Sequence, residues 1–182
     1  MGSRWSSSFR PATRRIGVVA LSLVALAIVA PGSAVAGGVR NVQILDRCDP
    51  DGFNAMFGDG VCILRNGGVP VEQFLRRVNP EDFGHNAWRF SPGQMTLKPG
   101  QVLQLNNRGG ETHSFTEVVD FGGGVIPPLN AVFPPGRPLA QPIGDLRFIP
   151  AGEQLDVTGL SMGTHLFECL IHPWMQATVG QA

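Results

Sequence analysis

The sequence predicts an all-β fold in the form of a β-sandwich. Glycine and proline are frequent, with 24 and 15 residues, which favours a loop-rich, strand-based structure over a helical bundle. From residue 86 on, short β-branched and aromatic runs alternate with Gly- or Pro-containing turns, and they indicate about seven or eight short strands. Residues 70–79 show the period of an amphipathic helix, and we expect no second helix of note.

The N-terminal segment has the pattern of an export signal. Four arginines precede an apolar run over residues 16–30, and the small residues 34–36 read Ala-Val-Ala. We therefore predict a signal peptide over residues 1–36 and an exported protein, periplasmic or extracellular. The Arg14-Arg15 pair leaves open whether export follows the general or the twin-arginine route. The run is shorter than the ~20 residues of a bilayer span, so membrane attachment requires that this segment be retained.

Charge argues against one class of function. All 14 acidic residues follow residue 36, but only ten of the 14 basic residues do, which leaves a net charge of about −4 after the signal. No Lys/Arg cluster beyond Arg76-Arg77 remains, so we expect no nucleic-acid binding. The remaining residues, about 146, fit one domain.

Residues 37–85 are predicted to form an N-terminal extension before the sandwich. Residues 37–68 look irregular because glycine and aspartate cluster there. Residues 70–79 place apolar side chains at helical spacing, after a proline that suits a helix start and before an Asn-Pro pair that ends it. The apolar face consists of Val71, Phe74, Leu75 and Val78.

The predicted sandwich covers residues 86–182. Strands are expected around Phe90, on both sides of the Pro99-Gly100 turn, and over residues 113–119, 155–157, 164–169 and 176–179. Residues 121–147 contain six prolines and five glycines, so they form a long loop. Its apolar residues favour packing of this loop on the sandwich over a disordered loop.

The odd number of cysteines requires an explanation in an exported chain. The simplest pairing joins Cys48 to Cys62 across a Gly/Asp-rich segment, and such a disulfide would stabilise the fold by about 3 kcal/mol. Cys169 is then left as a thiol that is prone to oxidation unless something occupies its sulfur. A bound metal ion would do so.

The C-terminal stretch FECLIHPWM carries the metal-binding hypothesis. Cys169, His172 and Met175 lie within seven residues on a loop between two predicted strands, so their side chains can converge on one ion. His113, at the start of an earlier strand, is the best candidate for a fourth ligand. A thiolate, two imidazoles and a thioether together select copper, whereas zinc rarely takes a thioether.

Two stretches resemble the cupredoxins, the type 1 blue copper proteins. FSPGQMTLKPGQVLQLNNRGGETHSF resembles the part of that family that ends in the first histidine ligand. FIPAGEQLDVTGLSMGTHLFECLIHPWM resembles its last hairpin. The ligand loop is most similar to those of amicyanin- and plastocyanin-type proteins, and the close Cys-x2-His-x2-Met spacing resembles that of amicyanin, since plastocyanin has a longer gap between histidine and methionine. The resemblance implies a cupredoxin-like Greek-key β-sandwich over residues 86–182. It also implies one type 1 copper per chain, held by His113, Cys169, His172 and Met175.

The chain departs from the family pattern at several positions. Ser114 stands where many cupredoxins have an asparagine that ties two loops together; serine can still hydrogen-bond but has a shorter reach, so we expect the tether between the loops to differ. His165 stands where the family often has tyrosine, and we expect it to be packed or hydrogen-bonded rather than a ligand. His85 is expected to be a surface or packing residue. Trp174 either forms part of an apolar docking patch beside an exposed His172 edge or packs against the ligand loop.

The resemblance implies a one-electron carrier between redox partner proteins, with no small-molecule substrate. The alternative is a copper carrier, buffer, sensor or accessory protein without an electron-shuttle role. Enzymes of the copper nitrite reductase or multicopper oxidase type need further histidines in His-x-His pairs, and this chain has none, so we expect no enzymatic activity. A cupredoxin fold that has lost its metal is disfavoured because all four expected ligands are present.

Overall fold

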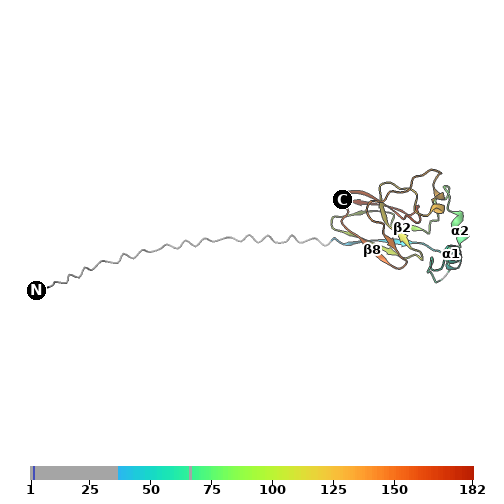
Figure 1. Cartoon of the computed structure of the whole chain (residues 1–182), viewed down its shortest axis with the longest axis horizontal. Coiled ribbons are helices and arrows are strands. Elements are labelled where there is room, and N and C mark those ends of the chain that lie inside the picture. Colours follow the sequence, from blue (N-terminus) through green and yellow to red (C-terminus); the bar gives the residue numbers. More distant parts are fainter. Residues whose placement is uncertain (1, 3–36, 66) are drawn as a thin grey trace. The chain divides into compact units, whose positions relative to one another are not determined.

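The computed structural model describes residue 2, residues 37–65 and residues 67–182 (Figure 1). The predicted export signal lies outside these residues, apart from Gly2. The described residues from 37 to 182 belong to one compact unit, which contains the helices and strands of the described chain. Among the described residues, no helix is both long and apolar enough to cross a membrane.

Two four-stranded sheets form the body of this unit. The first sheet has the order β2-β1-β4-β8, with β1 at Val39–Leu45, β2 at Arg89–Ser91, β4 at Val102–Asn107 and β8 at Gln154–Val157. The second has the order β3-β10-β9-β6, with β3 at Gln94–Leu97, β10 at Gln176–Gln181, β9 at Gly163–Glu168 and β6 at Thr116–Val118. A separate pair joins β5 (His113–Ser114) to β7 (Phe148–Ile149).

The strand order confirms the predicted Greek-key β-sandwich. β1 pairs in parallel with β4 and antiparallel with β2, and β10 pairs in parallel with β3 and antiparallel with β9. β2 and β3 are separated by only Pro92 and Gly93, yet they belong to different sheets. The chain thus crosses from one sheet to the other at this point, and each sheet is built from strands far apart in the sequence.

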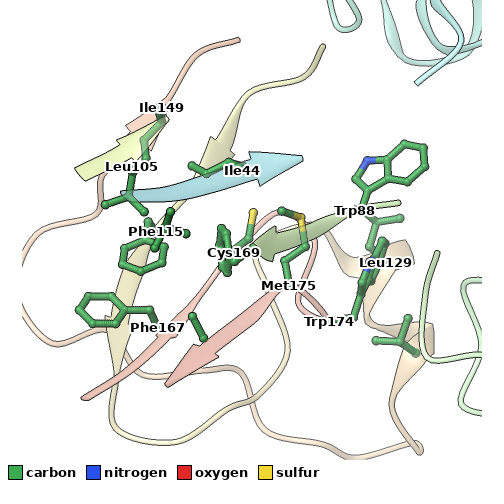
Figure 2. Close-up of a cluster of buried hydrophobic side chains, with 14 of the residues drawn as sticks. Ile44, Trp88, Leu105, Phe115, Leu129, Ile149, Phe167, Cys169, Trp174 and Met175 are labelled. Carbon is green, nitrogen blue, oxygen red and sulfur yellow. The ribbon is translucent and has the colours of Figure 1, made fainter. Parts of the chain in front are cut away.

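Apolar side chains from the two sheets meet in one core. Val42 and Ile44 of β1 are buried at a spacing of two residues, and so are Leu103 and Leu105 of β4, as expected for strands with one face in the core. The second sheet contributes Phe167 on β9, whose ring stacks on that of Phe115 with centroids 4.3 Å apart. Figure 2 shows these aromatic rings in the same cluster as Cys169 and Met175. The core therefore extends up to the loop that carries the candidate ligands.

The expected boundary at residue 85 does not coincide with the edge of the sandwich. β1 lies between β2 and β4 in the first sheet, so residues 39–45 are part of the sandwich and not of an extension. The prediction failed because Arg40 and Asn41 interrupt the apolar pattern and leave only Val42 and Ile44 as a short inward-facing alternation. In addition, the pairing partner β4 lies about sixty residues away, so no local pattern reveals it.

Helix α1 (Pro50–Phe57) was also not expected, and the prediction of an irregular segment is wrong here. Asp49 caps the helix, since its side chain accepts a hydrogen bond from the Gly52 N–H at 3.2 Å, and Pro50 occupies the first turn. The chain leaves the helix at Gly58, which has a φ of 113°. The Gly/Asp composition obscured these helix signals.

Helix α2 (Val71–Arg76) confirms the predicted amphipathic helix. Val71 and Phe74 are buried, while Leu75 is only partly covered. Phe74 lies 5.2 Å from Phe53 of α1 and 4.7 Å from Trp88, measured between ring centroids. This aromatic cluster holds the two helices side by side against the sandwich (Figure 1).

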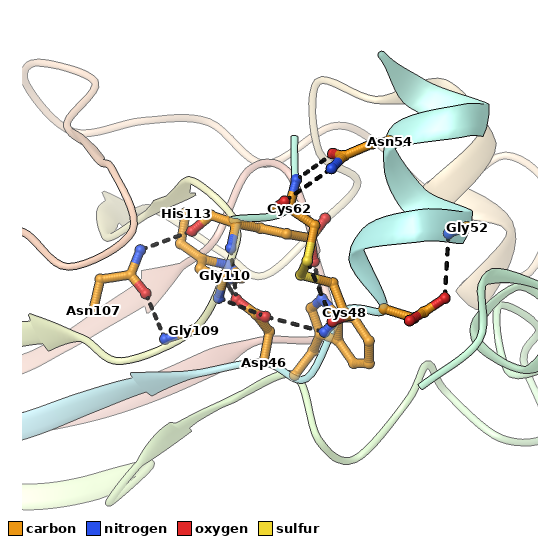
Figure 3. The surroundings of a disulfide bond; sticks show 12 residues. Asp46, Cys48, Gly52, Asn54, Cys62, Asn107, Gly109, Gly110 and His113 are labelled. Atoms are coloured by element: carbon orange, nitrogen blue, oxygen red, sulfur yellow. Dashed lines mark hydrogen bonds and ion pairs between the residues drawn. A yellow bond between two sulfur atoms is a disulfide. The ribbon is translucent and has the colours of Figure 1, made fainter. Parts of the chain in front are cut away.

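The predicted disulfide between Cys48 and Cys62 is present (Figure 3). It closes the segment that contains α1, and Asn54 adds two hydrogen bonds to the Cys62 backbone, at 2.9 and 3.0 Å. Cys169 is the one free cysteine among the described residues, and it is buried. The pairing leaves its thiol available to a metal.

The long loop over residues 121–147 packs on the sandwich in its first half, as expected. It contains a 3-10 helix, η1 (Pro127–Val132), which buries Leu129 and Val132. The Asn130 side chain donates to the Gly124 carbonyl at 3.1 Å and accepts from the Gly124 N–H at 2.7 Å. Leu139 and Ile143 in the second half are exposed.

The helical segment should depend on its aromatic cluster. Phe53 is 0 % exposed, so Phe53→Ala should lower the free energy of unfolding by about 3 kcal/mol because it removes a large ring from a packed site. Phe57, on the same helix, is 46 % exposed, and Phe57→Ala should cost less than about 1 kcal/mol. Urea unfolding of the two variants measures both values, and equal losses would contradict the assigned packing.

Candidate metal centre

Three of the four predicted ligands converge at one end of the sandwich. Cys169 directly follows β9, His113 begins β5, and His172 lies in the turn between β9 and β10. The Cys169 Sγ atom is 3.8 Å from the Nδ1 atom of His113 and 3.9 Å from the Nδ1 atom of His172. The three donor atoms lie within 4.8 Å of one another, and all three residues are buried.

The ligand turn is closed by backbone hydrogen bonds. The Cys169 N–H donates to the Met175 carbonyl at 2.9 Å, and the Met175 N–H donates to the His172 carbonyl at 2.9 Å. These bonds place Met175 directly opposite Cys169 on the backbone. Met175 is buried, and in Figure 2 its sulfur points to the same side as that of Cys169. The fourth predicted ligand thus belongs to the same turn.

Ser114 still ties the two segments of the site together, although an altered tether was expected from the sequence. Its backbone N–H donates to the Cys169 sulfur at 3.3 Å, and its hydroxyl accepts a hydrogen bond from the Leu170 N–H at 2.8 Å. The first contact gives the Cys169 sulfur a backbone donor in addition to the two nearby imidazoles. The second holds the strand with His113 against the ligand turn, so serine performs the tether despite its short side chain.

A carboxylate lies behind His113. The Nε2 atom of His113 is 2.8 Å from the Asp46 Oδ2 atom, and both side chains are completely buried. Asp46 also accepts hydrogen bonds from the backbone N–H groups of Cys48, Gly110 and Glu111, at 3.3, 2.8 and 3.1 Å (Figure 3). The carboxylate thereby fixes the imidazole from the side opposite to Cys169.

A second carboxylate lies near His172. The Glu111 Oε1 atom is 3.8 Å from the His172 Nε2 atom, and the Glu111 Oε2 atom accepts a hydrogen bond from the Trp88 ring at 2.5 Å. Burial is the largest influence on this group and raises the pKa of Glu111, and the negative charge of Asp46 adds to it. Each imidazole of the centre therefore has a carboxyl group on its outer side.

The protonation states of the metal-free site follow from these contacts. Burial opposes charge on the Cys169 thiol, but hydrogen bonds and charge from His113 and His172 outweigh it, so the pKa of Cys169 lies well below its usual value. Burial likewise opposes charge on His113, but Asp46 and Cys169 raise the pKa of His113 to about 10. Burial would raise the pKa of Asp46, yet the His113 contact and backbone donors lower it. The site holds a thiolate ready to bind a metal.

The donor set fits a soft transition-metal ion. Metal–sulfur and metal–nitrogen bonds are about 2.3 and 2.0 Å long, so one ion can touch the Cys169 sulfur and both Nδ1 atoms at the observed separations. The outer nitrogen of His113 is engaged by Asp46, which leaves Nδ1 as the nitrogen available to the ion.

The ligand turn is covered rather than open. His172 is 2 % exposed, and its ring lies 5.4 Å from Trp174 and 6.2 Å from Phe74 between centroids. Trp174 is itself buried, and a Cβ at Gly84 would come within 2.3 Å of its ring. Of the two roles considered for Trp174, the structure supports packing against the ligand turn. The docking-patch role would require an exposed edge of His172, and among the described residues this side chain is buried.

An apolar groove of about 290 Å³ lies above this cover. It runs between α1, α2 and η1, and its lining includes Phe57, Leu75 and Ile126, all partly exposed. Glu111 and His172 contribute its buried lining. His172 is the one candidate ligand in the lining of this groove.

The other two histidines lie away from the donor cluster. His165 is hydrogen-bonded to the Glu117 carboxylate at 2.6 Å and to the Ser161 carbonyl at 2.9 Å, so both ring nitrogens are occupied. His85 packs on Trp88 with ring centroids 5.3 Å apart. Both placements agree with the packing roles expected from the sequence.

Asp46 and Glu111 were missed by sequence reasoning. Asp46 continues the inward-facing alternation of Val42 and Ile44, so its carboxyl group points into the core. An acidic residue at such a position is a signal that a buried partner is present. Asp46 can be identified as inward-facing only if the preceding residues 39–45 are already known to form a strand.

Known proteins resemble this chain only in fold. No family model matches the chain, and no curated protein matches its sequence significantly. Similar solved structures include a purple cupredoxin from Nitrosopumilus maritimus, with 14 % identity, 58 % of this chain and 95 % of that chain covered, and a TM-score of 0.38. An amicyanin variant has 19 % identity, coverage of 52 % and 73 %, and a TM-score of 0.34. Plastocyanin from Dryopteris crassirhizoma has 14 % identity, coverage of 79 % and 100 %, and a TM-score of 0.39. The fold of the chain, with the strand order described above, is cupredoxin-like.

Glu168 lies beside the ligand turn and has an unusual environment. Its Oε2 atom accepts hydrogen bonds from the Gly122 N–H at 3.1 Å and the Gln176 side chain at 3.3 Å, while Oε1 has no partner among the described residues. Burial raises the pKa of Glu168 to about 8. The folded chain therefore favours the protonated carboxyl group at neutral pH.

This pKa predicts a pH-dependent stability. Because the folded pKa lies above the unfolded value of 4.5, the contribution of Glu168 is intact below pH 4.5 and is lost as pH rises through about 8. Glu168→Gln, which mimics the protonated form, should stabilise the metal-free protein by about 5 kcal/mol at pH 9 and by little at pH 4.5. Urea unfolding at both pH values measures this, and a difference independent of pH would contradict it.

Proposed function

We propose that the chain binds one copper ion as a type 1 centre through His113, Cys169, His172 and Met175, and that it carries single electrons between redox partner proteins. The observation that supports this most is the buried convergence of the Cys169 sulfur with two imidazole nitrogens at 3.8 and 3.9 Å. Zinc would use the cysteine and histidines, but the methionine in the same turn favours copper.

Copper in this site would supply a one-electron couple between Cu(I) and Cu(II). The chain's own residues hold the donor atoms in place before any ion binds, since Ser114, Asp46 and the backbone bonds of the ligand turn restrain them. A restrained and buried donor set changes little when the charge of the site changes. Burial of all four residues also excludes water from the donor atoms.

Electrons would leave through His172. This residue lines the apolar groove, whereas Cys169, His113 and Met175 are not part of its lining. The groove and the partly exposed Phe57, Leu75 and Ile126 beside it offer an apolar contact surface to a partner protein. The proposal assigns no small-molecule substrate and no enzymatic step to this chain.

The alternative role as a copper carrier or buffer is less well supported. Handing copper to another protein requires that a ligand of the acceptor reach the ion. In this chain Phe74, Trp88 and Trp174 surround His172, and the remaining three candidate ligands are buried as well. Electron transfer needs only a short distance through such a cover, so the geometry favours the electron carrier.

Export to the periplasm or the cell exterior is part of the proposal. The predicted signal over residues 1–36 carries it, and the Cys48–Cys62 disulfide supports it because disulfides persist in oxidising compartments. Attachment to a membrane would require that the N-terminal segment be retained.

The site assignment predicts a colour. Residues 37–182 loaded with Cu(II) should show an intense visible absorption band from thiolate-to-copper charge transfer, and Cys169→Ser should remove it. The Cys169→Ser variant should stay folded, because serine is nearly isosteric with cysteine. The measurement is visible absorption spectroscopy, together with quantification of the copper bound per chain. A colourless wild-type protein would contradict the assignment.

A matched control and a kinetic test complete this experiment. His165→Gln removes a histidine whose two ring nitrogens are engaged elsewhere, so that variant should keep the band. Transfer of Cu(I) from the loaded protein to a chelator should be slow relative to its oxidation by a small redox dye. Rapid release of the metal would instead favour the carrier role.

A further inference from the structure

Asp46 occupies a position that the alternation along β1 assigns to an apolar residue. It follows Val42 and Ile44 on the inward face at the end of β1, and its side chain is completely buried. A carboxylate in the core costs free energy unless several donors satisfy it. The sequence nevertheless places an acid here, next to a candidate ligand.

The surroundings of Asp46 are built for a carboxylate. The Oδ1 atom accepts from the N–H groups of Cys48 and Gly110, and the Oδ2 atom accepts from the Glu111 N–H and faces the His113 Nε2 atom. A Cβ at Gly109 would come within 1.8 Å of Oδ2, so only glycine lets the chain wrap this closely. An asparagine would turn its NH2 group toward an N–H donor in either orientation.

The contact decides which nitrogen of His113 faces the other ligands. With the Nε2 proton donated to Asp46, the Nδ1 lone pair is the one directed at the ion, and Nδ1 lies 3.8 Å from the Cys169 sulfur. The opposite tautomer would leave the Asp46 carboxylate without a proton donor from the imidazole. Hydrogen bonding to a carboxylate also increases the basicity of a ligating imidazole.

The Cys48–Cys62 disulfide holds this arrangement together. Cys48 donates its N–H to Asp46, and a Cβ at Gly110 would lie 2.7 Å from the Cys48 sulfur. The Ile63 N–H, next to Cys62, donates to the Gly110 carbonyl at 2.9 Å. The glycine turn that surrounds Asp46 is therefore packed on the disulfide, which gives the helical segment a role in shaping the site (Figure 3).

We propose that Asp46 is a positioning residue of the metal centre: its carboxylate holds His113 with Nδ1 toward Cys169, and its buried negative charge favours Cu(II) over Cu(I). This inference rests on the proposed copper site. The charge lies on the far side of one imidazole, in an interior where electrostatic interactions are weakly screened. A negative charge stabilises the more positive oxidation state, so the centre should have a lower reduction potential than it would without Asp46.

The test compares reduction potentials of the copper-loaded wild type, Asp46→Asn and the surface control Asp156→Asn. Asp46→Asn should shift the ratio of Cu(I) to Cu(II) affinity about tenfold or more toward Cu(I), which for a one-electron couple is an increase of about 59 mV per tenfold. Asp156→Asn should leave the potential unchanged. An Asp46→Asn protein that is blue and folded but has the wild-type potential would overturn the inference.

A second measurement covers the case in which Asp46→Asn fails to fold. In wild-type protein loaded with Zn(II), nitrogen-15 NMR of the histidines should show a proton on the His113 Nε2 atom, slow to exchange, and none on Nδ1. A proton on Nδ1 with a bare Nε2 would refute the inference. A wild-type protein without the blue band would instead refute the proposed function, and the zinc experiment would still report on the His113–Asp46 contact.

Discussion

Ser114 ties the two parts of the chain that form the candidate metal centre. His113 and Cys169 are 56 residues apart: His113 begins β5, Cys169 directly follows β9, and these two strands are not paired with each other. The Ser114 N–H contact to the Cys169 sulfur and the bond from the Leu170 N–H to its hydroxyl bring these strands into register at the site. The ligand turn then needs only its own backbone bonds to place His172 and Met175. The position of the donor atoms therefore depends on the hydrogen bonds of Ser114, and both of the segments that it joins are attached to the packed sandwich.

The segment between β1 and β2 of this cupredoxin-like fold contributes residues that surround the candidate metal centre. It supplies Asp46, which lies behind the His113 imidazole, and Trp88, whose ring N–H donates to the Glu111 carboxyl group near His172. Its helices cover His172, so the route to solvent passes an apolar groove instead of a bare histidine edge. The disulfide and the aromatic cluster fix this cover to the sandwich. This one segment thus contributes both to the electrostatics of the candidate centre and to the surface beside His172.

The sequence was sufficient for the sandwich, the disulfide, helix α2 and the residues that converge, because each leaves a local pattern or a characteristic spacing. For Ser114 the sequence indicated only that the tether would differ from that made by an asparagine. Strand β1 was not predicted, because it has few inward-facing apolar residues and its pairing partner β4 is far away in the sequence. Helix α1 was also not predicted, because the many glycine and aspartate residues around it indicated a loop and the capping role of Asp49 was not recognised. Asp46 and Glu111 depend on contacts between distant segments, and the burial of His172 depends on where the helices pack. These tertiary features have no local signature.

The central claim is that Cys169, His113 and His172 bind one copper ion together. X-ray absorption at the copper edge of the loaded wild-type protein tests this most directly, because it identifies the atoms bonded to the metal. The account predicts one sulfur at a short distance and two imidazole nitrogens around a single copper per chain. A shell of nitrogen and oxygen atoms without a short copper–sulfur bond would contradict it.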